Sequence, residues 1–280
     1  MNTPGYKRLA ELLSRADGEW RLAEAALAVA LDEYPGLDVA SCLGRLERLA
    51  GELARETPAG ASLEDRISAL NAVLFERHGF AGNTADYYDP RNSFINEVLE
   101  RRTGIPITLS IVYMEVARGA GLDLEGIAFP GHFLVGCPVA GGKVVLDPYA
   151  RGAPVGREDL EERLARLYGT AVLERVDVTE LLEPAEKRDI LGRVLRNLKA
   201  IYLKRGDLPR ALSAIERLLL VQPAMTAELR DRGLVFLEME CYRGALDDLE
   251  RYLGLEPDAD DADEIRARVV DLSRRVARLS

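Results

Sequence analysis

The sequence predicts a mostly helical α+β protein in two parts, and three observations support this. Apolar side chains recur at helical spacing through residues 1–121. Short runs of β type follow at about residues 124–148, and a 34-residue period appears from Ala185 onward. We therefore expect one domain over residues 1–180 and an α-helical domain over residues 185–280.

Composition excludes several classes of protein. The 280 residues carry a net charge of −10, which argues against a nucleic-acid-binding surface. The first 20 residues contain no apolar signal core, and no apolar run approaches the length of a membrane span. Three widely spaced cysteines in apolar surroundings indicate buried, reduced thiols. We expect a soluble, cytoplasmic protein that binds no membrane and has no cofactor.

The helices of the first part have recognisable ends. The stretch "WRLAEAALAVALDEYPG" predicts a helix that stops at Pro35-Gly36, and Asp38 is placed to cap the next one. A further helix is expected over Leu63 to Arg77. Ser93 is a candidate N-cap for a helix that ends before Gly104, where glycine favours a left-handed cap.

A buried helix and a small sheet follow. "PITLSIVYMEVARGAG" is apolar on nearly every face, and its Pro106 suits the first helical position. The runs "LEGIAF", "HFLVGC" and "KVVLD" are short strands separated by turn residues, which predicts a small antiparallel sheet.

The second part repeats every 34 residues. The matched pairs are Tyr202 and Phe236, Ala211 and Ala245, and Pro223 and Pro257. Small alanines allow two helices to approach closely, and each proline ends a helix, as in tetratricopeptide repeats. We expect units at about 190–223 and 224–257 and an end helix over 261–279.

Several stretches of the chain carry a family resemblance. "GFAGNTADYYDPRNSFINEVLERRTGIPITLSIVYMEVA", "FPGHFLV" and "LDPYARG" resemble the bacterial SirB family over essentially the whole chain. That resemblance implies a transglutaminase-like (papain-like) core followed by tetratricopeptide-like helices.

The wider transglutaminase-like superfamily uses a cysteine, a histidine and an aspartate, and the resemblance identifies two of these three positions. His132 matches the histidine and Asp147 the aspartate. The cysteine position falls on Pro106, which has no nucleophilic side chain. The sequence therefore departs from the superfamily at the residue on which its chemistry depends.

Two other residues are candidates for the missing nucleophile. Ser110 lies four residues beyond Pro106 on the same helix face, although its hydroxyl could instead bond a backbone carbonyl. Cys137 lies five residues after His132 on one strand, so the two side chains point to opposite faces. We expect Cys137 to be a core residue.

The histidine and the aspartate can meet across a hairpin. If Cys137 pairs with Gly142, His132 lies opposite Asp147 on the same face of the sheet. Such a pair is either a structural hydrogen bond or part of a functional pocket. His78, at a helix end before Gly79, is expected to serve as a cap, and no metal-ligand spacing is present.

Five further residues are candidates for a pocket wall. The loop before Ser93 supplies polar and aromatic side chains that the resemblance places near His132; the alternative role for its asparagines is to stabilise turns. A carboxylate in the buried helix either pairs with an arginine or faces the same pocket. These residues are Asn83, Tyr87, Tyr88, Asn92 and Glu115.

Three functions remain open. The first is a non-catalytic interaction or regulatory protein that binds a peptide or protein. The second is a cryptic hydrolase or acyltransferase that uses His132 and Asp147 with water or substrate as the attacking group. In the third, the repeats only brace the first domain.

Overall fold

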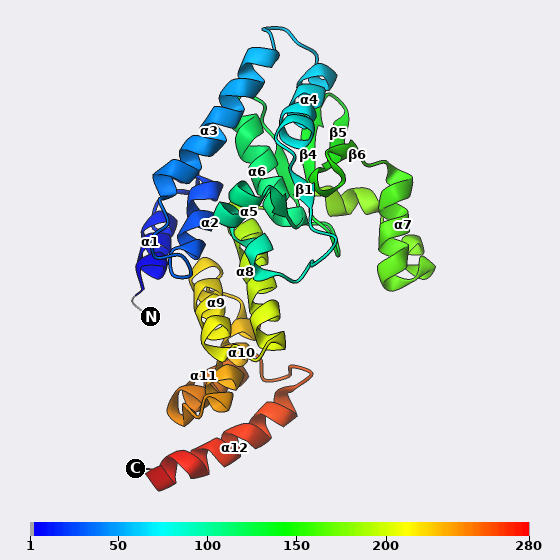
Figure 1. Ribbon diagram of the computed structural model, residues 1–280. Coiled ribbons are helices and arrows are strands. Elements are labelled where there is room, and N and C mark those ends of the chain that lie inside the picture. The colour runs from blue at the N-terminus through cyan, green and yellow to red at the C-terminus, as the bar shows by residue number, and fades with distance from the viewer. Residues whose placement is uncertain (1–2, 280) are drawn as a thin grey trace. The chain divides into compact units, whose positions relative to one another are not determined.

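The computed structural model describes residues 3–279, and the expected fold class is confirmed: the protein is mostly helical with one small antiparallel sheet (Figure 1). Residues 1, 2 and 280, which the expected domain limits include, lie outside the described residues. The chain forms two compact units, and the boundary between Val194 and Leu195 lies within a helix. Among the described residues, no helix is both long and apolar enough to cross a membrane.

The first unit contains seven complete helices within residues 3–194, and α8 begins there. Their bounds are α1 Pro4–Leu13, α2 Leu22–Ala30, α3 Val39–Glu56, α4 Leu63–Asn71, α5 Ile95–Arg101, α6 Pro106–Gly119, α7 Arg157–Tyr168 and α8 Lys187–Lys204. Asp38 caps α3 as expected, because its side chain accepts a 3.0 Å hydrogen bond from Ser41 N. The expected helix over residues 63–77 also forms, but its last six residues, Ala72–Arg77, are π-helical.

Three expected helix ends differ from the structure. The helix α2 stops at Ala30, before Pro35, and the intervening residues form turns. Phe94, not Ser93, is the N-cap of α5, since Ser93 is buried in a 3₁₀ turn. Arg102 rather than Gly104 takes the left-handed conformation, with φ 56°. 

Gly104 is needed for another reason. A Cβ at Gly104 would lie 2.8 Å from Thr108 Oγ1, so glycine lets this backbone approach the start of α6. That short segment, β2 (Thr103–Gly104), pairs in parallel with β1 (Ala81–Gly82).

The helix α6 is the central buried helix that the sequence predicts. Every residue from Pro106 to Ala117 is buried, and α6 runs beside α3 (Figure 1). The two helices approach so closely that a Cβ on Gly119 would lie 2.6 Å from Ala50 Cβ. This packing holds α6 in place against α3, and the sheet packs on α6.

The sheet has four antiparallel strands in the order β3-β4-β5-β6, with bounds β3 Glu125–Ile127, β4 Leu134–Val139, β5 Gly142–Asp147 and β6 Ala153–Pro154. The assumed hairpin register was wrong, because Cys137 lies opposite Val144 and Gly142 pairs with Val139. A two-residue loop, in which Gly141 has φ +89°, sets this tighter register. The shift is two residues, which leaves each side chain on its expected face.

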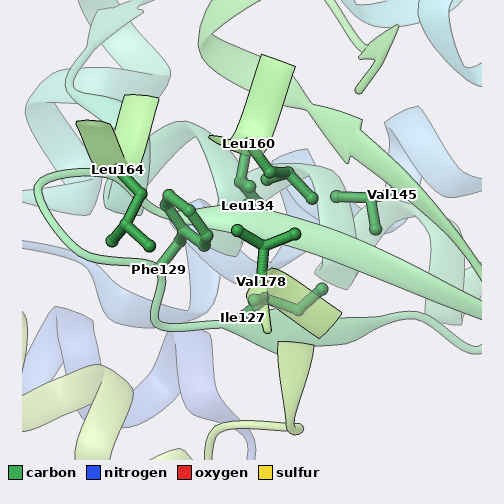
Figure 2. Packing of buried hydrophobic residues seen from close by; sticks show 7 residues of the cluster. All are labelled: Ile127, Phe129, Leu134, Val145, Leu160, Leu164 and Val178. Atoms are coloured by element: carbon green, nitrogen blue, oxygen red, sulfur yellow. The ribbon is translucent and has the colours of Figure 1, made fainter. Parts of the chain in front are cut away.

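A compact apolar core joins the sheet to α7. Figure 2 shows Leu160 and Leu164 of α7 directed toward strand side chains and toward Phe129. The seven buried residues of this core are Ile127, Phe129, Leu134, Val145, Leu160, Leu164 and Val178. Burial of this apolar surface holds α7 against the turn that precedes β4.

The second unit consists of helical hairpins. After the end of α8 come α9 Leu208–Val221, α10 Thr226–Glu238, α11 Tyr242–Leu255 and α12 Ala262–Leu279. Ala211 and Ala245 are fully buried, as expected for close helix crossings, and Pro223 and Pro257 follow the ends of α9 and α11. The 34-residue period therefore marks one hairpin per repeat.

The expectation that all three thiols are buried was wrong for one of them. Cys42 and Cys137 are buried, but Cys241 is exposed at the start of α11, directly after the left-handed Glu240. Burial raises the pKa of both the Cys42 and the Cys137 thiol. We expect one thiol per native chain to react rapidly with Ellman's reagent and three in denaturant, and Cys241→Ser to abolish the rapid phase.

Candidate functional site

His132 and Asp147 form a hydrogen-bonded pair. His132 lies in the turn before β4, and Asp147 is the last residue of β5. His132 Nε2 lies 2.9 Å from each carboxylate oxygen of Asp147. The carboxylate is almost fully buried, at 2% exposure of the residue. The sequence prediction that these two residues meet is therefore correct in geometry.

The pair forms although the assumed register was wrong. His132 precedes the paired part of β4, so it is free of the ladder that places Leu146 opposite Val135. Gly131 has φ +68°, and His132 N donates a 3.1 Å hydrogen bond to Phe129 O. This tight turn directs the imidazole back to the end of β5.

Asp147 is also held by neighbours that the sequence does not reveal. Arg163 Nη2 donates a 2.8 Å hydrogen bond to Oδ2, and the backbone N–H groups of Tyr149 and Ala150 donate to Oδ1 at 3.0 and 3.3 Å. Burial acts to raise the pKa of Asp147, but His132 and Arg163 outweigh it and lower the pKa below the usual value. The carboxylate is therefore ionised at neutral pH.

This arrangement determines the tautomer of the neutral imidazole. An ionised carboxylate only accepts hydrogen bonds, so His132 Nε2 must carry the hydrogen. Nδ1 then holds the lone pair when the ring is neutral. Because His132 lines a cleft, it offers this acceptor to a ligand.

The cleft has a volume of about 520 Å³. Its lining residues are Pro130, Gly131, His132, Asp147, Tyr149, Ala150, Asp159, Glu162, Arg163, Arg166 and Leu167. No cysteine, serine or threonine is among these described lining residues. The cleft thus supplies hydrogen-bonding groups and ion pairs, including Arg166–Glu162 at 2.7 Å, and its described lining contains no thiol or aliphatic hydroxyl that the imidazole could activate.

Sequence reasoning missed the wall contributed by α7. Arg163 and Leu167 belong to "REDLEERLARLYG", whose charges at helical spacing indicate only a solvated face. Leu167 lies so close to Gly131 that a Cβ on this glycine would be 2.8 Å from its side chain. Only the packing of α7 against the sheet shows that this face meets His132.

The two asparagines support a loop outside the cleft lining. Asn83 Nδ2 donates a 3.0 Å hydrogen bond to Asn92 Oδ1, and Asn83 Oδ1 accepts from Asp86 N at 2.9 Å. These bonds fit the alternative role in stabilising turns. Tyr149 OH donates to Asn83 O at 3.1 Å, so the loop is fastened to a residue of the cleft.

Tyr87 and Tyr88 also lie outside the cleft lining. Both are exposed, and their ring centroids are 5.4 Å apart. Burial of part of Tyr87 raises the pKa of its hydroxyl, and the nearby Tyr149 phenol adds to this effect. Tyr87 is therefore a neighbour of the cleft wall.

Glu115 faces a different cleft. Its carboxylate accepts hydrogen bonds from Arg118 at 2.8 Å and from Arg21 at 3.2 Å. It lines a cavity of about 420 Å³ beside Trp20 rather than the cleft at His132. Two roles were expected for Glu115, and in the structure it pairs with arginine. The reason is that α6 directs this side chain toward α2 and the turn before α2.

The candidate nucleophiles lie outside the His132 cleft. Pro106 is the first residue of α6, as expected, and is buried. Ser110 is fully buried, and its Oγ has no hydrogen-bond partner among the described residues, so the expected bond to a backbone carbonyl is absent. Cys137 is buried within β4, as expected for a core residue.

His78 contacts a carboxylate at the end of a helical segment. His78 is the C-cap of the π-helical segment, and its Nε2 lies 2.8 Å from Glu52 Oε2. Across residues 3–279, no group of three or more histidine, cysteine, aspartate or glutamate side chains is arranged to hold a metal ion.

Known proteins resemble this chain along most of its length. The transglutaminase-like superfamily matches residues 40–196, and the tetratricopeptide repeat family matches residues 198–269. A UPF0162 protein of Xylella fastidiosa is 42% identical over 253 residues, which is 90% of each chain. A UPF0162 protein of Pseudomonas aeruginosa is 32% identical over 92% of this chain and 93% of its own length.

A eukaryotic protein shares part of the chain. F-box only protein 21 of Mus musculus is 34% identical over 125 residues, which is 42% of this chain and 20% of the mouse protein. With the matched region covering more than half of the 280 residues, the chain belongs to the transglutaminase-like superfamily and carries tetratricopeptide repeats after that domain.

Proposed function

We propose that this chain is a non-catalytic, SirB-type binding protein, in which the His132 cleft recognises a peptide or protein segment. The observation that carries the proposal is the composition of the cleft: it retains the histidine–aspartate pair but none of its described lining residues is cysteine, serine or threonine. Pro106 stands where the superfamily resemblance expects the nucleophile.

The chemistry of the cleft suits a neutral or weakly cationic peptide. With His132 neutral, three carboxylates and two guanidinium groups leave a net charge of −1 in the lining. Nδ1 of His132 accepts a hydrogen bond, which a peptide N–H can donate. Leu167 and Tyr149 add apolar and aromatic surface for side chains of the ligand.

The second unit supports the same class of function. Helical repeats present surfaces that commonly recognise peptide segments. A protein or peptide partner, a cytoplasmic location and the absence of a catalysed reaction are all parts of this proposal. The unpaired state of the three cysteines is in keeping with a reducing compartment.

Peptide selection tests the proposal. A displayed random-peptide library is selected on the wild-type protein and counter-selected on His132→Ala. Enriched peptides should bind the wild type and lose about tenfold in affinity for His132→Ala, the loss expected for one hydrogen bond in a partly buried site. His78→Ala, which removes the other histidine, is the matched control and should bind as the wild type does.

The alternative is a cryptic hydrolase or acyltransferase, and the carboxylate-backed imidazole is the observation that favours it. In that reaction His132 Nδ1 would take a proton from water, or from a substrate hydroxyl or amine, as that group attacks the acyl carbon, and would return the proton to the leaving group as its bond breaks. Mass spectrometry of the selected peptides after incubation decides between the two functions. Cleavage or acyl transfer that disappears in His132→Ala would overturn the non-catalytic proposal.

A further inference from the structure

A second, basic cleft lies in the first unit and shares no lining residue with the His132 cleft. Its volume is about 200 Å³. Its lining residues are Arg45, Arg48, Leu49, Glu52, His78, Phe80, Leu99 and Arg102. Three arginines therefore converge on one small cleft in a chain whose net charge is −10.

Internal ion pairs satisfy only part of this charge. Arg45 binds the exposed Glu100 at 2.7 Å and Leu99 O at 2.5 Å. Glu52 is the carboxylate in the lining, and the hydrogen bond from His78 lowers the pKa of Glu52, so that carboxylate is ionised and already engaged. With His78 neutral, the lining has a net charge of +2.

The guanidinium groups of Arg48 and Arg102 make no hydrogen bond or ion pair with another described residue, and both residues are exposed. The backbone of Arg102 is held separately, because its carbonyl accepts a 2.9 Å hydrogen bond from Ala81 N. The attraction of a cation to the C-terminal end of a helix does not explain the positions of both arginines. Arg102 ends α5, where a cation is favoured, but Arg48 lies in the middle of α3, far from either helix end. Both side chains reach the same cleft from different helices.

Arg102 also occupies an unfavourable backbone position. Its φ is 56° and its ψ is 29°, a left-handed conformation at which glycine is the preferred residue. An arginine here is less stable than glycine, as is also the case for the left-handed Arg151 and Glu240. Leu49, Phe80 and Leu99, all buried, also line the cleft and form its apolar part.

We propose that this cleft binds the phosphate group of a small molecule. Guanidinium groups match the oxygens of phosphate in a forked, bidentate geometry, and a dianion balances the net charge of the lining. The small volume admits a phosphate group with a short substituent rather than a polymer.

Calorimetric titration of the full chain tests this assignment, with inorganic phosphate and glycerol 3-phosphate as probes at constant ionic strength. Both probes should bind saturably with a Kd on the order of 1 mM. Tighter binding of glycerol 3-phosphate identifies a phosphate monoester as the ligand, and equal or weaker binding identifies free phosphate. Arg48→Ala and Arg102→Gly should each weaken binding by about tenfold, as expected for loss of one charge-assisted contact.

Two controls show whether weaker phosphate binding comes from the cleft itself rather than from loss of any arginine or from unfolding. Arg15→Ala removes one exposed arginine outside the cleft and should leave the Kd unchanged. Arg102→Gly should also raise the Tm, since it relieves the left-handed strain, so weaker phosphate binding in this variant is not a consequence of unfolding. Absence of saturable binding, unchanged affinity in both arginine variants, or equal affinity for succinate would each overturn the proposal.

Discussion

Replacement of Asp147 by alanine is expected to lower the free energy of unfolding by about 3 kcal/mol. The carboxylate is 2% exposed and accepts hydrogen bonds from His132, Arg163 and two backbone N–H groups. Alanine would leave these donors without an acceptor. The expected loss lies at the low end of the range for a broken buried ion pair, because His132 and Arg163 are partly exposed and can be rehydrated.

The same substitution should alter the dependence of stability on pH. The pKa of Asp147 is lower in the folded chain than the value of about 3.9 expected for an unfolded aspartate. Its contribution is therefore fully present above about pH 4 and is lost as the pH falls through the folded-state pKa. Wild-type stability should fall more steeply with acid than that of Asp147→Ala.

Urea unfolding followed by circular dichroism, at pH 7 and at several lower values, measures both effects. Asp123→Ala is the matched control, since Asp123 is exposed and has no hydrogen bond or ion pair with another described residue. It should change stability by less than about 0.5 kcal/mol. A loss for Asp147→Ala as small as that of the control would show that the buried network contributes little.

Replacement of Gly152 by alanine should destabilise the protein by about 3 kcal/mol through two separate effects. Gly152 has φ +74°, which is unfavourable for alanine. Its new Cβ would also lie 2.0 Å from Asn71 Oδ1, the atom that accepts a 2.8 Å hydrogen bond from the buried Tyr113 hydroxyl. Movement of Asn71 would leave that hydroxyl unsatisfied.

Gly141 provides a matched control for the backbone effect. It has φ +89°, but a Cβ there would meet no atom within 4 Å. Gly141→Ala should therefore cost only about 1 kcal/mol. Thermal and urea unfolding of both variants separate the two effects, and equal losses at Gly152 and Gly141 would rule out the steric contribution. In an Asn71→Ala background the penalty at Gly152 should shrink, because the clashing amide is absent.

Local sequence patterns were reliable where neighbouring residues decide the structure. The cap at Asp38, the start of α6 at Pro106 and the small antiparallel sheet depend on backbone preferences and on apolar periodicity within a few residues. The helix ends followed the local sequence pattern less closely. Arg102 rather than Gly104 ends α5 in a left-handed conformation, and Gly104 instead allows the backbone to approach Thr108.

The pairing of His132 with Asp147 shows the same division. The resemblance identified both residues, but the assumed cross-strand pairing does not bring them together, because His132 lies in the turn before β4, outside the paired residues. The loop at Gly141 sets the actual register, and the turn at Gly131 brings the imidazole to the carboxylate. Neither the hairpin register nor the orientation of the imidazole follows from the spacing of residues along the chain.

The sequence by itself determined the class of fold, the repeat, His132 and Asp147 as candidate residues, and the proline at the expected position of the nucleophile. Only the tertiary structure decided which side chains share a cleft: Arg163 and Leu167 of α7 meet His132, Glu115 faces elsewhere, and Arg48 converges with Arg102. The physical reason is that helical and strand periods are local, whereas a cleft is formed by apolar cores that bring distant segments together, as Leu160 and Leu164 bring α7 to the sheet.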